Sequence, residues 1–257
     1  MPNPEVSVVI PTCDRDPRLS IQSVLDQTYQ DFEILVYFDG DPDLWMKLTR
    51  ELFSAYKFTN FVLISKFKKY RGASAARNEG IKIARGKFIA FCDDDDIYLP
   101  EHLKYLVKYM SKNLKTDIVF SKGWGIKSKE CNVTRAEIWI EELSNGKWKG
   151  ILPGQYYQPE RIFWDSIAPL PCFLIRKKCF EHAGLFNEGL RSLNDFELIN
   201  RFALSGFTIN GIDEFTIQYS VHGKGINSKD PDKTAKIAQA IRRRSQCKAW
   251  KRGLIRS

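Results

Sequence analysis

Aspartates stand at three points of this sequence where a strand is expected to end or a helix to begin. Asp39 follows one apolar run, the run Asp93–Asp96 follows another, and Asp195 opens a segment with helical spacing. Carboxylates can accept hydrogen bonds, bind a hard metal ion or take up a proton. These three points are therefore the first candidates for a binding or catalytic site.

The four adjacent carboxylates of Asp93–Asp96 need compensating charge, because unit charges ~4 Å apart repel by about 1 kcal/mol even in water. If the chain stays extended there, Asp93 and Asp95 point to one side and Asp94 and Asp96 to the other. Two carboxylates on one side form half of a Mg²⁺ or Mn²⁺ site that substrate phosphates would complete. The alternative is a solvated turn in which Asp96 caps the next helix.

Short apolar runs rich in β-branched residues alternate with segments of helical spacing in the first hundred residues. This alternation predicts an α/β fold with parallel strands, whose carboxyl ends form the crevice where such sheets bind ligands. The strands are expected at residues 6–10, 33–38, 61–65 and 87–92.

The pattern is less regular after residue 100. Strand-like pieces from 124 to 177 include a hairpin signal at Asn145-Gly146. The other elements expected here are a helix over 100–113, a strand over 116–121, a helix over 195–204 and one or two strands over 207–219.

The composition is that of a globular protein, since 43% of the 257 residues are hydrophobic and 28% are charged. The N-terminus lacks a basic region followed by a long apolar run, so no secretory signal is expected. The longest apolar runs have about five residues, whereas a membrane-spanning helix needs about 20. The six cysteines contain no CxxC pair, which favours reduced thiols in the cytoplasm and argues against structural zinc.

The positive charge is concentrated at the C-terminal end. Residues 229–257 carry a net +8 of the total +9, so residues 1–228 are nearly neutral. The cations are not confined to one face of a helical projection, so a typical amphipathic membrane helix is not predicted. Three interpretations of this basic tail stay open: attraction to anionic lipid headgroups with Trp250 at the interface, binding to nucleic acid, or a solvated helix.

Seven motifs, taken in order, resemble those of the family 2 glycosyltransferases with the GT-A fold. They are Val6–Thr12, Ser23–Tyr29 with Asp31–Ile34, Val36–Gly40, Gly72–Asn78, Asp93–Asp96, Asn194-Asp195 and Tyr219–Gly223. Each motif alone is weak evidence, but seven in the family's order are hard to obtain by chance. The sequence departs from the family at Phe38, which replaces the first aspartate of the nucleotide-binding motif, and at Asn194, which replaces a glutamate.

The resemblance implies a Rossmann-like mixed sheet with parallel N-terminal strands flanked by helices, and a role for each matching residue. Those implied to contact the nucleotide sugar are Pro11, Asp39, Arg77, Asp93 and Asp94. Asp95 and His222 are implied to hold Mn²⁺ or Mg²⁺, and Asn194 and Trp164 to contact the acceptor. Asp195 is implied to be the general base that deprotonates an acceptor hydroxyl during a single, inverting displacement.

We therefore expect a metal-dependent hexosyltransferase that uses a UDP-sugar to build a cell-surface glycan or glycolipid. The expected organisation is one GT-A domain over 1–228, with a nucleotide-sugar half 1–97 and an acceptor half 98–228, and a helical basic tail over 229–257. The expected location is the cytoplasm, with the tail touching the inner face of the membrane and nucleic acid the less favoured partner.

The alternatives to this function are a catalytically silent nucleotide-sugar-binding protein and a basic-tailed nucleic-acid-binding protein. At single positions, Asp39 could be a turn residue and Asp195 a helix cap.

Overall fold

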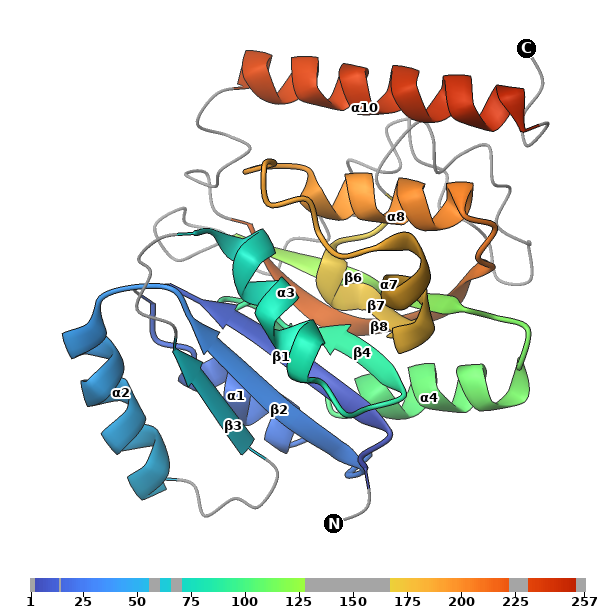
Figure 1. The fold of residues 1–257 in the computed structure, drawn as a ribbon. Helices are drawn as coiled ribbons and strands as arrows, with labels where there is room; N and C mark the ends of the chain where they lie inside the picture. Colours follow the sequence, from blue (N-terminus) through green and yellow to red (C-terminus); the bar gives the residue numbers. More distant parts are fainter. Residues whose placement is uncertain are drawn as a thin grey trace.

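The computed structural model describes residues 3–13, 15–55, 61–65, 71–127, 167–221 and 231–252. These residues form one sheet with the strand order β3-β2-β1-β4-β7-β6-β8-β5, with helices on both faces (Figure 1). The strands are β1 (Val6–Thr12), β2 (Phe32–Phe38), β3 (Phe61–Ser65), β4 (Phe88–Phe91), β5 (Ile97–Tyr98), β6 (Ile118–Lys127), β7 (Phe173–Arg176) and β8 (Ile209–Val221).

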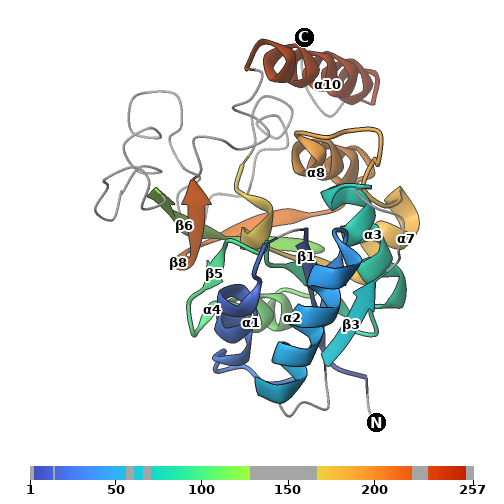
Figure 2. The same cartoon turned by 90° about the vertical axis from the view of Figure 1, so that its left-hand side faces the viewer.

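The helices cover the sheet in two layers (Figure 2). The α3, α7 and α8 helices lie on one face, and α1 and α4 lie on the other. The helices are α1 (Arg18–Leu25), α2 (Pro42–Ala55), α3 (Ala73–Ile83), α4 (His102–Lys112), α7 (Lys177–Ala183), α8 (Asn194–Leu204) and α10 (Pro231–Lys251), with a 3₁₀ turn, η1, at Leu170–Cys172.

The N-terminal half confirms the expected parallel strands. β1 pairs in parallel with β2 on one side and with β4 on the other, and β2 pairs in parallel with β3. Every residue of β1, β2 and β4 is buried, which is why these strands read as continuous apolar runs rather than as alternating ones.

The C-terminal half extends the sheet with mixed directions. β7 lies between β4 and β6 and is antiparallel to both, whereas β8 runs parallel to β6. β4, β6 and β8 therefore all point toward the same edge as β1 and β2. The strands and helices expected over 100–121 and 195–219 are present, while the Asn145-Gly146 hairpin lies outside the described residues.

Aromatic side chains fix α7 and α8 to the sheet. The Phe91 ring of β4 meets the Phe180 and Phe186 rings edge-on, at centroid distances of 6.1 and 5.4 Å. Phe180 in turn meets Phe202 of α8 at 5.2 Å. These buried contacts hold α7 and the C-terminal part of α8 in place relative to the end of β4.

A close backbone contact joins the end of the α3 segment to β1. The Gly86 backbone N–H donates to the Ser7 hydroxyl at 2.8 Å. A Cβ atom at Gly86 would lie only 2.5 Å from the Ser7 backbone nitrogen, so this position requires glycine.

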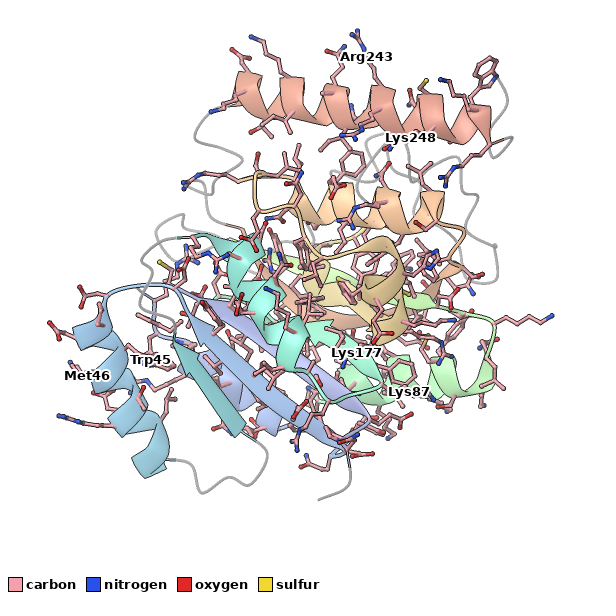
Figure 3. All side chains as sticks on the ribbon, in the orientation of Figure 1. Trp45, Met46, Lys87, Lys177, Arg243 and Lys248 are labelled. Atoms are coloured by element: carbon pink, nitrogen blue, oxygen red, sulfur yellow. The ribbon has the colours of Figure 1, made fainter. Side chains whose placement is uncertain are left out.

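The basic C-terminal segment forms α10, which packs on α8 (Figures 1 and 3). Ser245 and Ala249, four residues apart, are buried against the body, whereas Lys236 and Arg243 are exposed on the other side. The Trp250 side chain is 57% exposed. Among the described helices, none has the length and hydrophobicity needed to cross a membrane.

Candidate active site

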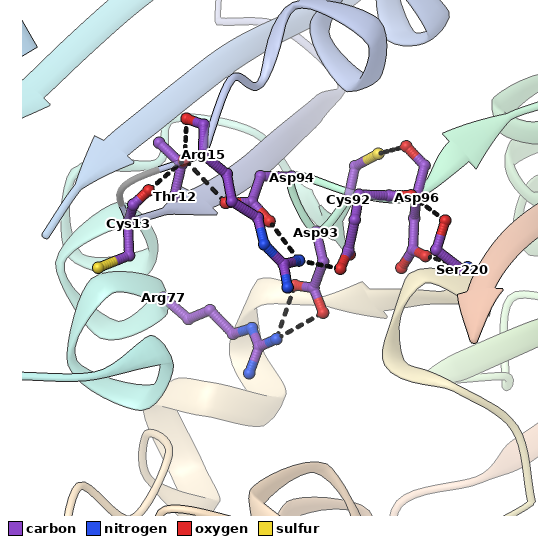
Figure 4. A network of polar contacts seen from close by, with 10 residues as sticks. Thr12, Cys13, Arg15, Arg77, Cys92, Asp93, Asp94, Asp96 and Ser220 are labelled. Carbon is purple, nitrogen blue, oxygen red and sulfur yellow. Dashed lines mark hydrogen bonds and ion pairs between the residues drawn. The ribbon is translucent and has the colours of Figure 1, made fainter. Parts of the chain in front are cut away.

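The acidic residues meet at one edge of the sheet. The parallel strands β1, β2 and β4 end at this edge, and α3 and α8 begin there. Thr12 is the last residue of β1, Asp39 directly follows β2, and Asp93 follows β4 after one intervening residue. Figure 4 shows the polar network around Asp93–Asp96, to which Thr12 of β1 and Ser220 of β8 also belong.

The acidic run forms a turn instead of continuing the strand. The Asp96 backbone N–H donates to the Asp93 carbonyl oxygen at 3.0 Å, which closes a β-turn. The expectation that Asp93 and Asp95 share one side of an extended chain was therefore wrong. The turn gives the carboxylates different surroundings: Asp93 pairs with one arginine, Asp94 and Asp95 pair with another, and Asp96 accepts from a backbone N–H.

Asp93 pairs with a buried arginine. The Arg77 guanidinium, on α3, donates to both Asp93 carboxylate oxygens at 2.6 and 2.8 Å, and its side chain is only 7% exposed. Arg77 also approaches the Asn194 amide oxygen at 3.4 Å. This ion pair therefore joins α3, the acidic turn and the start of α8.

Asp94 and Asp95 share a second, exposed arginine. The Thr12 hydroxyl donates to Asp94 at 2.8 Å, and the Arg15 guanidinium pairs with both Asp94 and Asp95. Burial raises the pKa of Asp94 to about 6, with smaller contributions from the neighbouring negative charges of Asp95 and Asp93. The main cause is the loss of water around the carboxylate, and the Thr12 hydroxyl and the Arg15 charge offset part of the rise.

Asp96 is buried and connects the acidic turn to a neighbouring strand. Its carboxylate is fully buried and accepts from the Ser220 backbone N–H at 2.8 Å. Burial raises the pKa of Asp96 well above its usual value. Asp96 therefore ties the acidic turn to β8, and it does not cap the following helix, for which Glu101 is the N-cap residue.

Asp39 is buried, and one of its two carboxylate oxygens accepts a hydrogen bond from the protein. Its Oδ2 accepts from the Gly72 backbone N–H at 2.6 Å, at the start of α3. Gly72 has φ +94°, a left-handed conformation that glycine adopts without strain. Within the described part of the chain, Asp39 Oδ1 is buried without a hydrogen-bond partner. A buried oxygen without a donor lowers the stability of the fold unless a ligand donates a hydrogen bond to it. This observation therefore favours a ligand-binding role for Asp39 over a role as a simple turn residue.

Asn194 and Asp195 begin α8. The Asn194 amide donates to the Ser74 hydroxyl at 2.9 Å, and Asp195 Oδ1 accepts from the Phe196 backbone N–H at 2.8 Å. The N-cap residue is Leu193, which has φ 56°, so Asp195 lies inside the first turn and is not the cap. Burial raises the pKa of Asp195, and the Phe196 N–H and the Arg77 charge offset part of the rise.

A sequence model of the family described as Glycosyl transferase family 2 matches residues 7–184, more than two thirds of the chain. The chain belongs to this glycosyltransferase family. An uncharacterized glycosyltransferase of Methanocaldococcus jannaschii is 27% identical over 225 residues, which cover 86% of this chain and 72% of that relative. One of Rickettsia felis is 32% identical over 231 residues, 89% of this chain, but the chain spans only 35% of that relative.

Solved structures share the fold at low sequence identity. S. aureus TarS in complex with UDP-GlcNAc superposes with a TM-score of 0.68 and 18% identity, over 92% of this chain and 65% of that one. The mannosyltransferase PcManGT from Pyrobaculum calidifontis, in complex with GDP-Man and Mn²⁺, gives a TM-score of 0.68 and 16% identity, over 93% and 65%. The GT-A fold expected from the sequence is confirmed.

The site brings together most of the residues that the family motifs point to, but not all. Pro11 is buried inside β1 opposite Tyr37, one residue before the site edge. His222 directly follows β8, and Trp164 belongs to the segment 128–166; both lie outside the described residues. Sequence reasoning missed Thr12, Arg15 and Ser220, because no local pattern shows that they contact the acidic turn.

The acidic turn has the chemistry of a divalent-cation site without a complete ligand shell. Its carboxylate oxygens are the hard donors that Mg²⁺ and Mn²⁺ prefer, and three of its aspartates, Asp93, Asp94 and Asp95, pair with two arginines, Arg77 and Arg15. Across the residues that the structure describes, no group of three or more metal-binding side chains comes together. One or two carboxylates completed by substrate phosphates is the arrangement expected for Mg²⁺.

Proposed function

We propose that this family 2 glycosyltransferase transfers a sugar from a UDP-sugar donor to an acceptor hydroxyl, with inversion, as a cation-dependent hexosyltransferase. The observation that carries the proposal is the meeting of Asp39, the acidic turn and Asp195 at one edge of the sheet. The structural neighbours solved with UDP-GlcNAc and with GDP-Man and Mn²⁺ support a nucleotide-sugar donor.

The donor would lie along the ends of β1, β2 and β4. Asp39 Oδ1 would accept a hydrogen bond from the base or ribose, because it is a buried acceptor that lacks a protein donor among the described residues. Asp93 and Asp94 would contact the ribose and diphosphate region beside Pro11. Arg77 would hold Asp93 in place and offset phosphate charge.

Asp95 and His222 are the residues that would hold Mn²⁺ or Mg²⁺. When bound, the cation would neutralise the charge that develops on the leaving diphosphate. The protein's own part is to orient Asp95, and the Ser220 hydroxyl does this by donating to the Asp95 carbonyl oxygen.

Asp195 would take the proton from the attacking acceptor hydroxyl. Burial raises its pKa toward the range in which a carboxylate is an effective base, and the first turn of α8 fixes its orientation. Asn194 can hydrogen-bond an acceptor sugar but cannot act as a base, and Trp164 would stack on that sugar.

The acceptor would be a cell-surface glycan or glycolipid precursor, made at the cytoplasmic side of a membrane. The outward face of α10 supports this location. Lys236, Arg243 and Lys251 lie seven and eight residues apart, so they share one exposed face, where Arg243 points away from the body (Figure 3). Trp250, seven residues after Arg243, lies on the same side and is 57% exposed. Flotation with vesicles of phosphatidylcholine, with or without phosphatidylglycerol, tests the contact. The wild type should float with the anionic vesicles, and the Arg243→Glu variant should not.

The proposed function is tested by nucleotide release from UDP-, GDP-, CDP- and dTDP-sugars, with candidate acceptors and Mn²⁺. One donor class should be turned over, and Asp195→Asn should lower turnover at least ~10³-fold while donor binding is kept. Donor binding without turnover by any acceptor would favour a catalytically silent protein. Salt-sensitive binding of nucleic acid by residues 229–257 would favour the other alternative.

A further inference from the structure

Two arginines compensate the acidic turn, and they differ in exposure. Arg77 is buried on α3 and binds Asp93 through two hydrogen bonds. Arg15 lies between β1 and α1, its side chain is 54% exposed, and it reaches both Asp94 and Asp95 (Figure 4). Because more than half of it is exposed, the Arg15 side chain has room to change partner.

Arg15 and the cation of the proposed function compete for one carboxylate. Arg15 pairs with Asp95 Oδ2, and Asp95 is the residue that would hold Mn²⁺ or Mg²⁺. Two positive charges at one carboxylate repel each other strongly, because they would be within about 4 Å. An exposed ion pair contributes little to stability, so releasing Arg15 is inexpensive.

We propose that Arg15 exchanges partners when the donor binds. Before binding, it neutralises Asp94 and Asp95; after a cation occupies Asp95, its guanidinium pairs with the diphosphate of the nucleotide sugar. A guanidinium suits this second role because its planar N–H groups can bind phosphate oxygens in pairs. The inference rests on the proposed function and assigns Arg15 as a residue that positions the diphosphate and gates access to the cation site.

Two binding measurements with Arg15→Ala test the exchange. Mn²⁺ binding to the nucleotide-free protein, followed by electron paramagnetic resonance, should become about two- to fivefold tighter, because a competing cation is lost. UDP binding at saturating Mn²⁺, followed by calorimetry, should become about tenfold weaker, because a charged phosphate contact is lost. Uridine, which has no phosphate, should bind both proteins equally.

Arg18→Ala is the matched control. Arg18 lies three residues further along, is 51% exposed, and pairs with Asp16 and Glu51 rather than with the acidic turn. It should change neither Mn²⁺ nor UDP binding.

The affinities for Mn²⁺ and for UDP are expected to change in opposite directions, which distinguishes an exchange of partners by Arg15 from a purely structural role. Weaker binding of both Mn²⁺ and UDP would mean that Arg15 only orders the turn, and unchanged binding of either would also overturn the proposal. In both cases, cation-dependent UDP binding by the wild type would leave the proposed function intact. A wild type that binds neither Mn²⁺ nor UDP would overturn both.

Discussion

Arg77→Met should destabilise the protein by about 3 kcal/mol. Removing one partner of a buried ion pair typically costs about 3–5 kcal/mol, because the other charge stays behind without compensation. The lower end applies here because the Asp93 side chain is 26% exposed, so water can solvate part of the remaining charge. Methionine keeps most of the apolar stem of Arg77, so the loss reports mainly the charge and its hydrogen bonds.

The assay is urea unfolding at pH 7 and 25 °C, together with thermal melting. For a chain of this length, about 3 kcal/mol corresponds to a fall in Tm of roughly 6 °C. A double-mutant cycle with Asp93→Asn should give a coupling free energy of about 2 kcal/mol. Arg15→Ala, which removes the exposed arginine at the same turn, should cost less than about 1 kcal/mol.

Two results would refute this reasoning. One is a loss below about 1 kcal/mol for Arg77→Met, which would mean that the pair is solvated or absent in solution. The other is simple additivity with Asp93→Asn, which would mean that the two side chains do not interact.

Three further changes probe the nucleotide position, a buried histidine and a close backbone contact. Asp39→Ala should weaken UDP binding at least about tenfold in calorimetry, because both its ligand-facing oxygen and its bond to Gly72 are lost. Burial lowers the pKa of His102 to about 3, so the unfolded chain takes up a proton below pH 6.5 and the folded one does not. Stability should therefore fall as the pH falls from 6.5 toward 3, and His102→Gln should reduce the slope measured by urea unfolding by up to ~1.4 kcal/mol per pH unit. Gly86→Ala should lower the unfolding free energy by about 1–3 kcal/mol, since its methyl group would collide with the Ser7 backbone; an unchanged value would contradict the close contact.

The parallel half of the fold could be predicted from the sequence because its physics is local. Strands buried on both faces, such as Val6–Thr12, are mostly apolar, and the helices between them are amphipathic. The edge at which Asp39 and the acidic turn meet follows from the parallel direction of these strands. These features depend on residue patterns within a few positions of each other.

The partners of the individual carboxylates could not be predicted, because they come from distant parts of the chain. Asp94 meets Thr12 across 82 positions, and Ser220 donates to Asp96 across 124. Four identical residues in a row give no indication of which one is buried, which is paired and which faces a ligand. The turn that sorts them is closed by the Asp96 N–H and the Asp93 carbonyl oxygen, and contacts from Arg77, Arg15 and Ser220 hold its carboxylates.

The packing of α10 on α8 could not be predicted from the sequence either. Its composition shows a basic helix, but its small buried residues, Ser245 and Ala249, carry no strong apolar signal. Ile237 and Ile241, which are partly buried, continue this spacing of four, so a narrow stripe of small and apolar residues faces the body. Arg242 and Arg252 lie outside the outward cationic face, in agreement with the expectation that the cations do not share one side.

Calorimetric titration of the purified protein with UDP, GDP, CDP and dTDP, with and without Mn²⁺, tests the nucleotide-sugar site most directly. We expect UDP to bind, at least about tenfold more tightly with Mn²⁺ than without it, and Asp95→Ala to lose that difference. If a folded sample binds none of the four nucleotides under either condition, the site at the ends of β1, β2 and β4 does not bind a nucleotide sugar.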